Sequence, residues 1–406
     1  MAQKKLVQYG AGNIGRGFIG ELFARSGYEV VFIDVQEQVV NRLNQDRAYP
    51  VRYMSDEGFS EIVISGVRAV NGMDTAAVAN EIATANVLAT AVGVNVLPKI
   101  IEPIAAGLKQ RHAAGNHTPL NIIICENLLD ADTYMRNAVS ERLSEDEAVI
   151  LDNTGFIEAS IGRMVPVMTE EMQEGNILRV CVEKYAELPV DGDAIKGEIP
   201  QVQGLIPASP FSYYIRRKLF IHNMGHAICA YLGSLQGHKL ISDAVRDPYI
   251  RIIAEAAMGQ SARALAKEYG MDYGLLHDHI KDLIFRFHNR ALGDTTERVG
   301  YDPLRKLAAT DRLAGAALYC ASHCLPAGYI NIGIAAGLTY VNSADEAGVK
   351  IQKMIASSGL SAVLKTLCGI EPAGDLGVQI AEFYDMLKNG VSLGEILYKA
   401  DVESLK

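Results

Sequence analysis

A glycine-rich turn between a short strand and a helix constrains the fold of this chain more than any other feature. The apolar stretch 5–9 (KLVQY) has strand character, and the stretch 18–27 (FIGELFARSG) has helical spacing. Between them, Gly10, Gly12 and Gly15 form the pattern G-x-G-x-x-G. In this context the first glycine permits a tight turn, the second lets the backbone approach a pyrophosphate, and the third allows close helix–strand packing. The pattern therefore predicts a dinucleotide site.

An acidic residue at the end of the next strand narrows the choice of cofactor. Asp34 closes the stretch EVVFID, where a carboxylate accepts from the ribose hydroxyls of NAD and repels the 2′-phosphate of NADP. No arginine follows Asp34 directly, and no further flavin-binding glycine segment favours FAD. The stretch ATAVG, 89–93, is expected to face the nicotinamide ribose, although a plain strand end is equally compatible. The expected NAD-binding residues are Gly10, Ala11, Gly12, Asn13, Ile14, Gly15, Asp34, Thr90, Ala91, Val92 and Asn127.

Strand-like and helix-like stretches alternate through the first half of the chain. Strand character at 29–34, 85–93 and 120–127 is separated by helical spacing at 39–45 and 100–115. This order predicts an α/β domain with a doubly wound, mostly parallel sheet that helices cover on both faces.

The character of the sequence changes after about residue 190. The stretch 188–210 is rich in glycine and proline, and from Phe211 onward the pattern is mostly helical. We therefore expect a Rossmann domain over residues 1–195 and a mainly α-helical catalytic and substrate domain over residues 196–406.

The charge of the chain argues against several classes of partner. The 406 residues carry a net charge of −10 without a long basic run, so neither nucleic acid nor an anionic membrane is expected as the main partner. The first apolar stretch is too short for a signal sequence, and none approaches the ~18 apolar residues of a spanning helix. The six cysteines are scattered, which disfavours a disulfide framework or a cysteine-rich zinc site. We expect a cytoplasmic protein with a small-molecule substrate.

The stretch KLFIHNMGH, 218–226, combines three polar groups in a helical segment. In an α-helix, Asn223 would lie about 140° and His226 about 80° around the axis from Lys218, so all three fit on one side. A lysine can act as the base for an alcohol, and an asparagine amide can donate to an alkoxide. By periodicity alone, a solvated polar stripe is equally compatible. No metal is expected, because His222 and His226 lack a third ligand at useful spacing.

These stretches also carry a resemblance to a known family. The pattern Lys-x4-Asn-x2-His at 218–226 resembles the signature of the polyol-specific long-chain dehydrogenases/reductases, and YGAGNIGRGFIG, TAVG, PLNIIICEN and ERVGYDPLRKLAATDRL add to the likeness. The resemblance covers nearly the whole chain and implies a Rossmann domain, a helical C-terminal domain and no metal. It implies that Lys218 is the general acid/base, that Asn127 and Asn223 stabilise the oxyanion, and that His226 orients the substrate hydroxyl.

The resemblance also implies residues of the substrate pocket. Arg298 and Lys306 match family positions that line it, with salt bridges on the helical domain as the alternative. Similar proteins carry V-D-R before a proline where this chain has Gly162 in place of the aspartate, and Glu158 is the carboxylate that could replace it. This departure bears on the identity of the substrate more than on the chemistry.

The resemblance implies the reversible oxidation of D-mannitol 1-phosphate to D-fructose 6-phosphate with NAD as the expected reaction. A phosphorylated substrate needs cations. The candidates are Arg298, Arg305, Lys306 and Arg312, followed by Arg216 and Arg217. One alternative is a same-family enzyme acting on free mannitol and fructose, or on fructuronate or tagaturonate. The other is a non-catalytic NAD-binding regulatory protein, against which the intact catalytic set argues. No oligomeric state is predicted.

Overall fold

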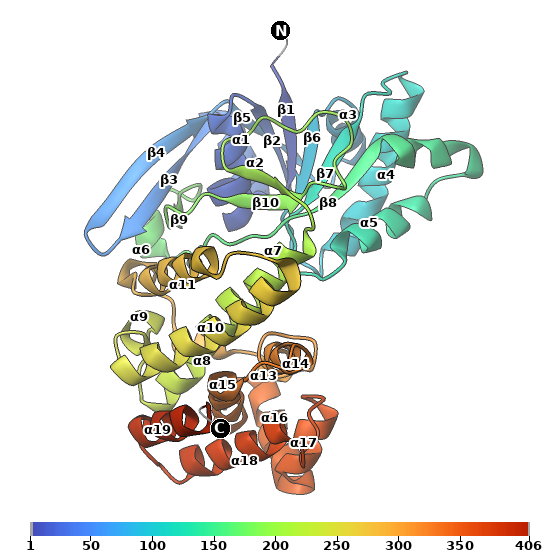
Figure 1. The fold of residues 1–406 in the computed structure, drawn as a ribbon. Coiled ribbons are helices and arrows are strands. Elements are labelled where there is room, and N and C mark those ends of the chain that lie inside the picture. The colour runs from blue at the N-terminus through green and yellow to red at the C-terminus, as the bar shows by residue number, and fades with distance from the viewer. Residues whose placement is uncertain (1–2, 405–406) are drawn as a thin grey trace. The chain divides into compact units, whose positions relative to one another are not determined.

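The computed structural model describes residues 3–404, and the chain divides into two compact units between Tyr214 and Ile215. The first unit is an α/β domain, and the second is built of helices (Figure 1). This division confirms the fold class expected from the sequence. The boundary at residues 195 and 196 stays a prediction. In the structure β11 (Leu205–Ala208) pairs with β10 (Leu188–Asp191), and both strands belong to the first unit.

A parallel sheet of six strands forms the centre of the first unit, in the order β5-β2-β1-β6-β7-β8. The strands of this unit are β1 (Lys5–Tyr9), β2 (Glu29–Asp34), β3 (Ala48–Ser55), β4 (Gly58–Ser65), β5 (Val67–Asn71), β6 (Val87–Thr90), β7 (Leu120–Ile124), β8 (Thr154–Glu158), β9 (Val180–Val182), β10 and β11. Its helical segments are η1 (Gly15–Gly20), α1 (Glu21–Arg25), α2 (Glu37–Asp46), α3 (Thr75–Ala83), α4 (Leu97–Ala113), α5 (Ala131–Ser140), η2 (Glu145–Asn153) and α6 (Glu170–Gln173). The strand order reverses between β1 and β6, which is where open α/β sheets bind ligands.

Helices cover both faces of this sheet. Successive strand residues point to opposite faces, so Leu6 packs with Phe18 and Leu43 of η1 and α2, whereas Val7 packs with Ile104 of α4 on the other side. All five side chains are fully buried, and each such burial contributes about 1.5–3 kcal/mol relative to exposure. The two hydrophobic layers hold the carboxyl ends of the strands in fixed positions.

A second sheet, which was not expected from the sequence, extends the first unit. Strand β3 pairs antiparallel with β4 and parallel with β9. Figure 1 shows β3 and β4 as a long hairpin beside the main sheet. The Gly/Pro-rich stretch 188–210 contains both β10 and β11.

The second unit follows helical patterns that begin and end at sequence signals. Its helical segments are α7 (Ser212–Arg217), which spans the division, η3 (Lys218–Asn223), α8 (Met224–Leu235), α9 (Ile241–Ala244), α10 (Pro248–Tyr269), α11 (Tyr273–Phe287), η4 (Arg290–Leu292), α12 (Thr296–Gly300), α13 (Pro303–Lys306), α14 (Ala314–Ser322), α15 (Gly328–Thr339), α16 (Glu346–Ser358), α17 (Leu360–Thr366), α18 (Asp375–Lys388) and α19 (Leu393–Ser404). In α10, Asp247 accepts from the backbone N–H of Tyr249 and Ile250, Pro248 occupies the first turn, and Gly270 ends the helix at a φ of +64°. The buried helices α8 and α15 form the core against α10.

Among residues 3–404, no helix combines the length and the apolar character needed to cross a membrane. Five of the six cysteines are buried thiols, and Cys324 is exposed.

Candidate active site

The glycine turn after β1 adopts the geometry that its spacing predicts. Gly10 has a φ of +93°, and a Cβ there would lie 2.4 Å from the carbonyl oxygen of Ala91, in the loop after β6. A Cβ at Gly15 would lie 2.0 Å from the carbonyl oxygen of Gly10, so neither position admits a side chain. A Cβ at Gly12 would meet nothing within 4 Å. The backbone at the second glycine is therefore open to the close approach of a pyrophosphate.

The carboxylate of Asp34 lies at the end of β2 and is held against the glycine turn. Its Oδ2 accepts from the backbone N–H of Ala11 at 2.8 Å, and its Oδ1 accepts from that of Gln36 at 2.9 Å. Each carboxylate oxygen has a further lone pair, so both can still accept from ribose hydroxyls. The residues at this position fit an adenosine ribose.

A cavity of about 510 Å³ opens beside Asp34, within the size range of small-molecule pockets. It is lined by Ala11, Gly12, Asn13, Arg16, Asp34, Gln36, Glu37, Gln38, Val39, Gln173 and Ile177. The structure thus brings four of the predicted cofactor residues together around one space. It adds Arg16 of η1 as well as Gln173 and Ile177, at and beyond the end of α6. The glycine pattern alone does not indicate these residues.

Glu126, which the sequence did not single out, organises the loop after β6. Its buried carboxylate accepts from the backbone N–H of Val92 at 2.9 Å and from that of Gly93 at 2.8 Å. Thr90 is fully buried, and its hydroxyl has no hydrogen-bond partner in the part of the chain that the structure describes. Ala91 and Val92 are half-buried, so they are the predicted residues of this loop that remain accessible.

Two other predicted residues follow the carboxyl ends of neighbouring strands. Asn127 is exposed just beyond β7, and Glu158 is the last residue of β8. The Glu158 carboxylate accepts from the backbone N–H of Ala131, the first residue of α5, at 2.8 Å. Burial raises the pKa of Glu158 to about 7. The hydrogen bond from Ala131 opposes this shift, and the nearby charge of Asp132 adds to it. Glu158 can therefore hold or release a proton near neutral pH.

Gly162, which replaces an aspartate of similar proteins, lies against an aromatic ring. A Cβ at this position would be 3.1 Å from Cε1 of Tyr185, so a larger residue would have to displace the ring. The next residue, Arg163, fixes the position of Gly162 in the fold. Its fully buried guanidinium lies 2.5 Å from the carboxylate of Glu21 and donates to the carbonyl of Gly17 at 2.8 Å.

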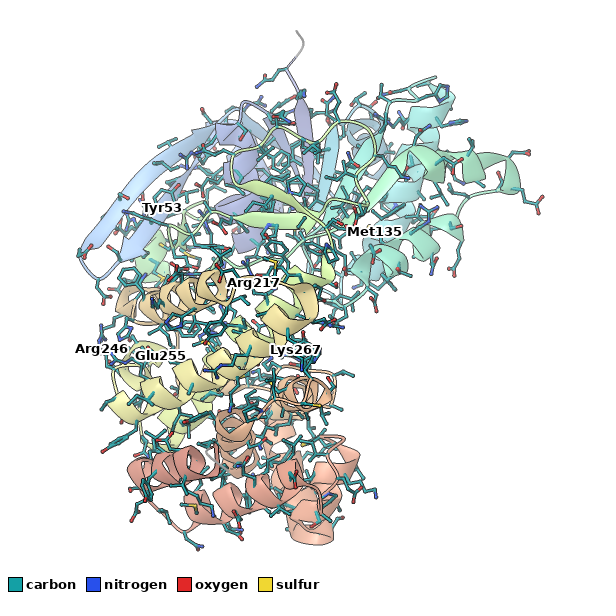
Figure 2. The ribbon with its side chains drawn as sticks, in the orientation of Figure 1. Tyr53, Met135, Arg217, Arg246, Glu255 and Lys267 are labelled. Atoms are coloured by element: carbon teal, nitrogen blue, oxygen red, sulfur yellow. The ribbon has the colours of Figure 1, made fainter. Side chains whose placement is uncertain are left out.

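In the second unit, residues 218–223 form a π-helical turn, η3, between α7 and α8. The α-helical angle assumed between Lys218 and Asn223 is therefore wrong, because a π-turn winds the chain more loosely. The side chains of the three predicted residues, Lys218, Asn223 and His226, are half-buried. Residues 220–222, which lie between the first two, are buried. Figure 2 labels Arg217, which ends α7 immediately before the turn. Partial burial does not fit a fully solvated stripe, and π-turns inside α-helices are frequent at functional sites.

His226 is held by two residues of the same unit. Its ring stacks on Phe287, with centroids 4.7 Å apart and an interplanar angle of 13°, and its Nε2 lies 3.1 Å from Oδ2 of Asp294. Oδ1 of Asp294 accepts from Nε of Arg298 at 2.8 Å. Burial acts to raise the pKa of Asp294, but the interactions with His226 and Arg298 outweigh it and hold this pKa below its usual value. The predicted residues His226 and Arg298 are thus joined through one carboxylate.

The other cations predicted for the substrate are engaged inside the second unit. Lys306 is only 4% exposed, and its Nζ donates to the carbonyl oxygen of Val299 at 2.6 Å and to that of Tyr301. Burial, assisted by the charge of Arg312, lowers the pKa of Lys306 to about 7. Arg305 pairs with Asp302 and Asp311, Arg312 with Asp311, and Arg216 with Glu268. Arg298, with its side chain 49% exposed, is more accessible than Arg305, Arg216, Arg312 and Lys306.

The two histidines of the π-turn region lie close together but differ in burial. The rings of His222 and His226 are 6.2 Å apart between centroids, and burial keeps the pKa of His222 well below its ordinary value. Within the ranges that the structure describes, no three His, Cys, Asp or Glu side chains gather in a way that would hold a metal ion.

This combination of fold and side chains defines the chain as a two-domain dehydrogenase. The chain belongs to the mannitol dehydrogenase family, whose Rossmann domain matches residues 4–204 and whose C-terminal domain matches residues 211–384. It is 40% identical over 369 residues to a mannitol-1-phosphate 5-dehydrogenase of Brevibacillus brevis, covering 91% of this chain and 94% of that one. A mannitol-1-phosphate 5-dehydrogenase of Bacillus pumilus is 39% identical over 374 residues, covering 92% of this chain and 97% of the relative.

Solved structures of more distant dehydrogenases share the fold. The mannitol 2-dehydrogenase of Pseudomonas fluorescens, in a ternary complex with NAD and D-mannitol, superposes with a TM-score of 0.75 at 16% identity, covering 98% of this chain and 94% of the other. A substrate-free D-sorbitol dehydrogenase gives a TM-score of 0.80 at 15% identity, covering 97% and 95%. The likeness extends over both units and supports the same fold in each.

Proposed function

We propose that the protein is an NAD-dependent dehydrogenase that interconverts D-mannitol 1-phosphate and D-fructose 6-phosphate. The observation that carries the proposal is the set of Lys218 and Asn223 on the π-turn and His226 in the first turn of α8, all half-buried. The chain that holds them is 40% identical to a mannitol-1-phosphate 5-dehydrogenase. A regulatory NAD-binding protein would have no need to keep three such groups partly shielded from water.

The first unit supports NAD as the cofactor on two grounds. The backbone at Gly12 is open to a pyrophosphate, and the cavity beside it contains the carboxylates of Asp34 and Glu37. Two carboxylates in one cavity repel the 2′-phosphate of NADP, because like charges at close range in a partly dry site are costly. NADH should therefore be used in strong preference to NADPH.

The catalytic roles follow from the chemistry of each side chain. Bound NAD⁺ supplies the acceptor for the hydride that leaves carbon 5 of the polyol. The amine form of Lys218 takes the proton of the carbon 5 hydroxyl and later releases it to solvent. The amides of Asn223 and Asn127 donate to the oxygen as it gains negative charge, and His226 fixes the direction of the hydroxyl before transfer. No metal is assigned to the reaction.

The orientation of His226 supports its proposed role. Stacking on Phe287 fixes the plane of the imidazole, and the Asp294 carboxylate at 3.1 Å favours a proton on Nε2. Because Nε2 faces this carboxylate, we assign Nδ1 to the substrate hydroxyl, although the contact at Nε2 does not have the geometry of a hydrogen bond. Asp294 thus acts on the substrate only through His226.

Arg298 is the cation that we assign to the substrate phosphate. The guanidinium of Arg298 is half-exposed and carries five N–H donors. Asp294 accepts from only some of these donors. Lys306, by contrast, directs its Nζ to the carbonyl oxygens of residues 299 and 301, so its role is to shape the turn beside Arg298.

The test is a comparison of substrates with the purified protein. Rates of NADH oxidation are measured with fructose 6-phosphate, fructose, fructuronate and tagaturonate. We expect kcat/KM for fructose 6-phosphate to exceed that for fructose by about 10³-fold, because sites built around a charged group reject analogues that lack it. A preference for fructose or a hexuronate would reassign the substrate within the family. No turnover with any of them, despite tight NADH binding, would support the regulatory protein.

A further inference from the structure

Arg16 is buried beneath the glycine turn, and no carboxylate among residues 3–404 is bonded to it. It is the second residue of η1, and only 5% of it is exposed. Its Nη1 donates to the carbonyl oxygen of Ala11 at 2.6 Å, whereas its buried Nε has no hydrogen-bond partner among residues 3–404. A buried guanidinium with unused donors is costly unless something else satisfies it.

The residue Ala11 is held at both its backbone N–H and its backbone carbonyl oxygen. Its N–H donates to the carboxylate of Asp34 at 2.8 Å, and its carbonyl oxygen accepts from Arg16 at 2.6 Å. The carbonyl of Arg16 in turn accepts from the hydroxyl of Tyr49, which is buried, at 2.7 Å. These bonds fix the peptide that leads directly into Gly12, the residue whose backbone is open to a ligand.

Arg16 also lines the cavity beside Asp34, where it is the one cation among eleven lining residues. The acidic residues of the same lining are Asp34 and Glu37. Burial lowers the pKa of Arg16, and the charge of Asp34 opposes this effect. An arginine stays charged under these conditions, so its field acts on whatever occupies the cavity.

We propose that Arg16 is a positioning residue for the dinucleotide, which fixes the Ala11–Gly12 peptide and supplies the positive charge that favours the pyrophosphate in this cavity. The inference rests on the proposed use of NAD. It assigns the recognition of the pyrophosphate to a side chain as well as to the glycine backbone, and it explains why a charged residue is buried at this point of η1.

The test is binding of NADH, ADP-ribose and adenosine to Arg16→Met and Arg16→Lys, by fluorescence and by competition, without any sugar. For Arg16→Met, we expect Kd for NADH and for ADP-ribose to rise at least about 30-fold, as for a lost charged hydrogen bond. Arg16→Lys keeps the charge and one donor, so we expect a rise of about 3- to 10-fold. Adenosine, which lacks phosphate, should bind within about 3-fold of wild type in both. Arg25→Met, on the exposed side of α1, is the matched control and should change nothing.

Two results would overturn the inference. One is ADP-ribose binding within about 3-fold of wild type in a folded Arg16→Met protein. The other is an equal loss of adenosine and ADP-ribose binding, which would make Arg16 only a wall of the adenosine pocket. If Arg16→Met does not fold by circular dichroism, the same comparison of ADP-ribose with adenosine in Arg16→Lys decides. Failure of the proposed reaction would appear separately, as absent turnover in a wild-type protein that still binds NADH.

Discussion

The carboxylate of Glu126 accepts a hydrogen bond from the backbone N–H of Gly93 at 2.8 Å. Its other oxygen accepts from the N–H of Val92, so one buried side chain fixes two successive peptides of the loop after β6. This loop contains Ala91, against which the glycine turn packs at Gly10. The relationship links the positions of two loops at the switch point of the sheet.

Glu126→Gln should weaken cofactor use more than it weakens folding. A glutamine can accept only one of the two N–H groups and presents an NH₂ to the other, which loses about 1.5–3 kcal/mol of charge-assisted bonding. We expect KM for NADH to rise about 10-fold and the melting temperature to fall by a few degrees. Steady-state kinetics and thermal unfolding check both. Asn127→Ala is the informative comparison, because Asn127 is assigned to both the cofactor and the oxyanion, so this variant should lower kcat as well as raise KM for NADH.

Asp294→Asn should reduce turnover by releasing His226. The asparagine keeps the size of the side chain but removes the charge that favours a proton on Nε2, so we expect kcat to fall about 10- to 100-fold with little change in NADH binding. Rates with fructose 6-phosphate give kcat, and fluorescence gives the NADH affinity. Unchanged kcat would show that Asp294 only anchors Arg298.

The same variant makes a prediction about stability and pH. Because the folded state lowers the pKa of Asp294, this carboxylate stabilises the protein above its unfolded pKa of about 3.9, and the contribution is lost as the pH falls through the folded value. Wild type should therefore be more stable than Asp294→Asn at pH 7. Denaturant unfolding should show the difference shrinking below about pH 4.

Glu158 should have the opposite effect on stability. Its folded pKa of about 7 lies above the unfolded value of about 4.3, so the folded state binds an extra proton between these values and loses stability as the pH rises. Glu158→Gln keeps an acceptor for Ala131 and removes the buried charge. We expect it to be more stable than wild type by about 1–2 kcal/mol at pH 8, allowing for partial solvent screening, and equal to it near pH 4. Equal stability at pH 8 would contradict a raised pKa.

Gly162→Asp should shift the substrate preference. The new side chain must displace Tyr185, at a cost of about 1–3 kcal/mol, and its carboxylate would repel a phosphorylated sugar. We expect the ratio of kcat/KM for fructose 6-phosphate to that for fructose to fall at least about 10-fold. Gly162→Asn has nearly the same size without the charge and should leave the ratio within about 3-fold. If both variants change it equally, the effect comes from Tyr185 and not from charge.

Much of the first unit could be predicted because its signals are local. Short stretches of consecutive residues are enough to recognise the glycine pattern, the strand that ends at Asp34 and the alternation of strands with helices. Strands β3 and β4 were missed, although residues 48–65 are rich in β-branched and aromatic residues around the turn signal at 56–58. An antiparallel hairpin there interrupts the alternation of strands and helices, so a prediction based on this alternation alone does not include it.

The details of the site depend on contacts that the sequence does not display. Glu126 meets Gly93 across 33 residues of chain, and its role follows only from the pairing of β6 with β7. The π-turn at 218–223 leaves no periodic signature, because one extra residue in a turn shifts the apolar pattern only once. Nothing in the sequence around Arg16 indicates that this arginine is buried, and only the fold shows it.

The central claim is that Lys218 removes the substrate proton in an NAD-dependent oxidation of mannitol 1-phosphate, and a single-turnover experiment tests it most directly. Enzyme in excess is mixed with NAD⁺ and mannitol 1-phosphate, and NADH absorbance is followed for wild type, Lys218→Ala and Lys267→Ala. The last variant is the control, because Lys267 is an exposed residue in the last turn of α10 (Figure 2). We expect NADH to form about 10²- to 10⁴-fold more slowly in Lys218→Ala, with NADH affinity unchanged, and at the wild-type rate in Lys267→Ala. NADH formation by Lys218→Ala at the wild-type rate would contradict the account.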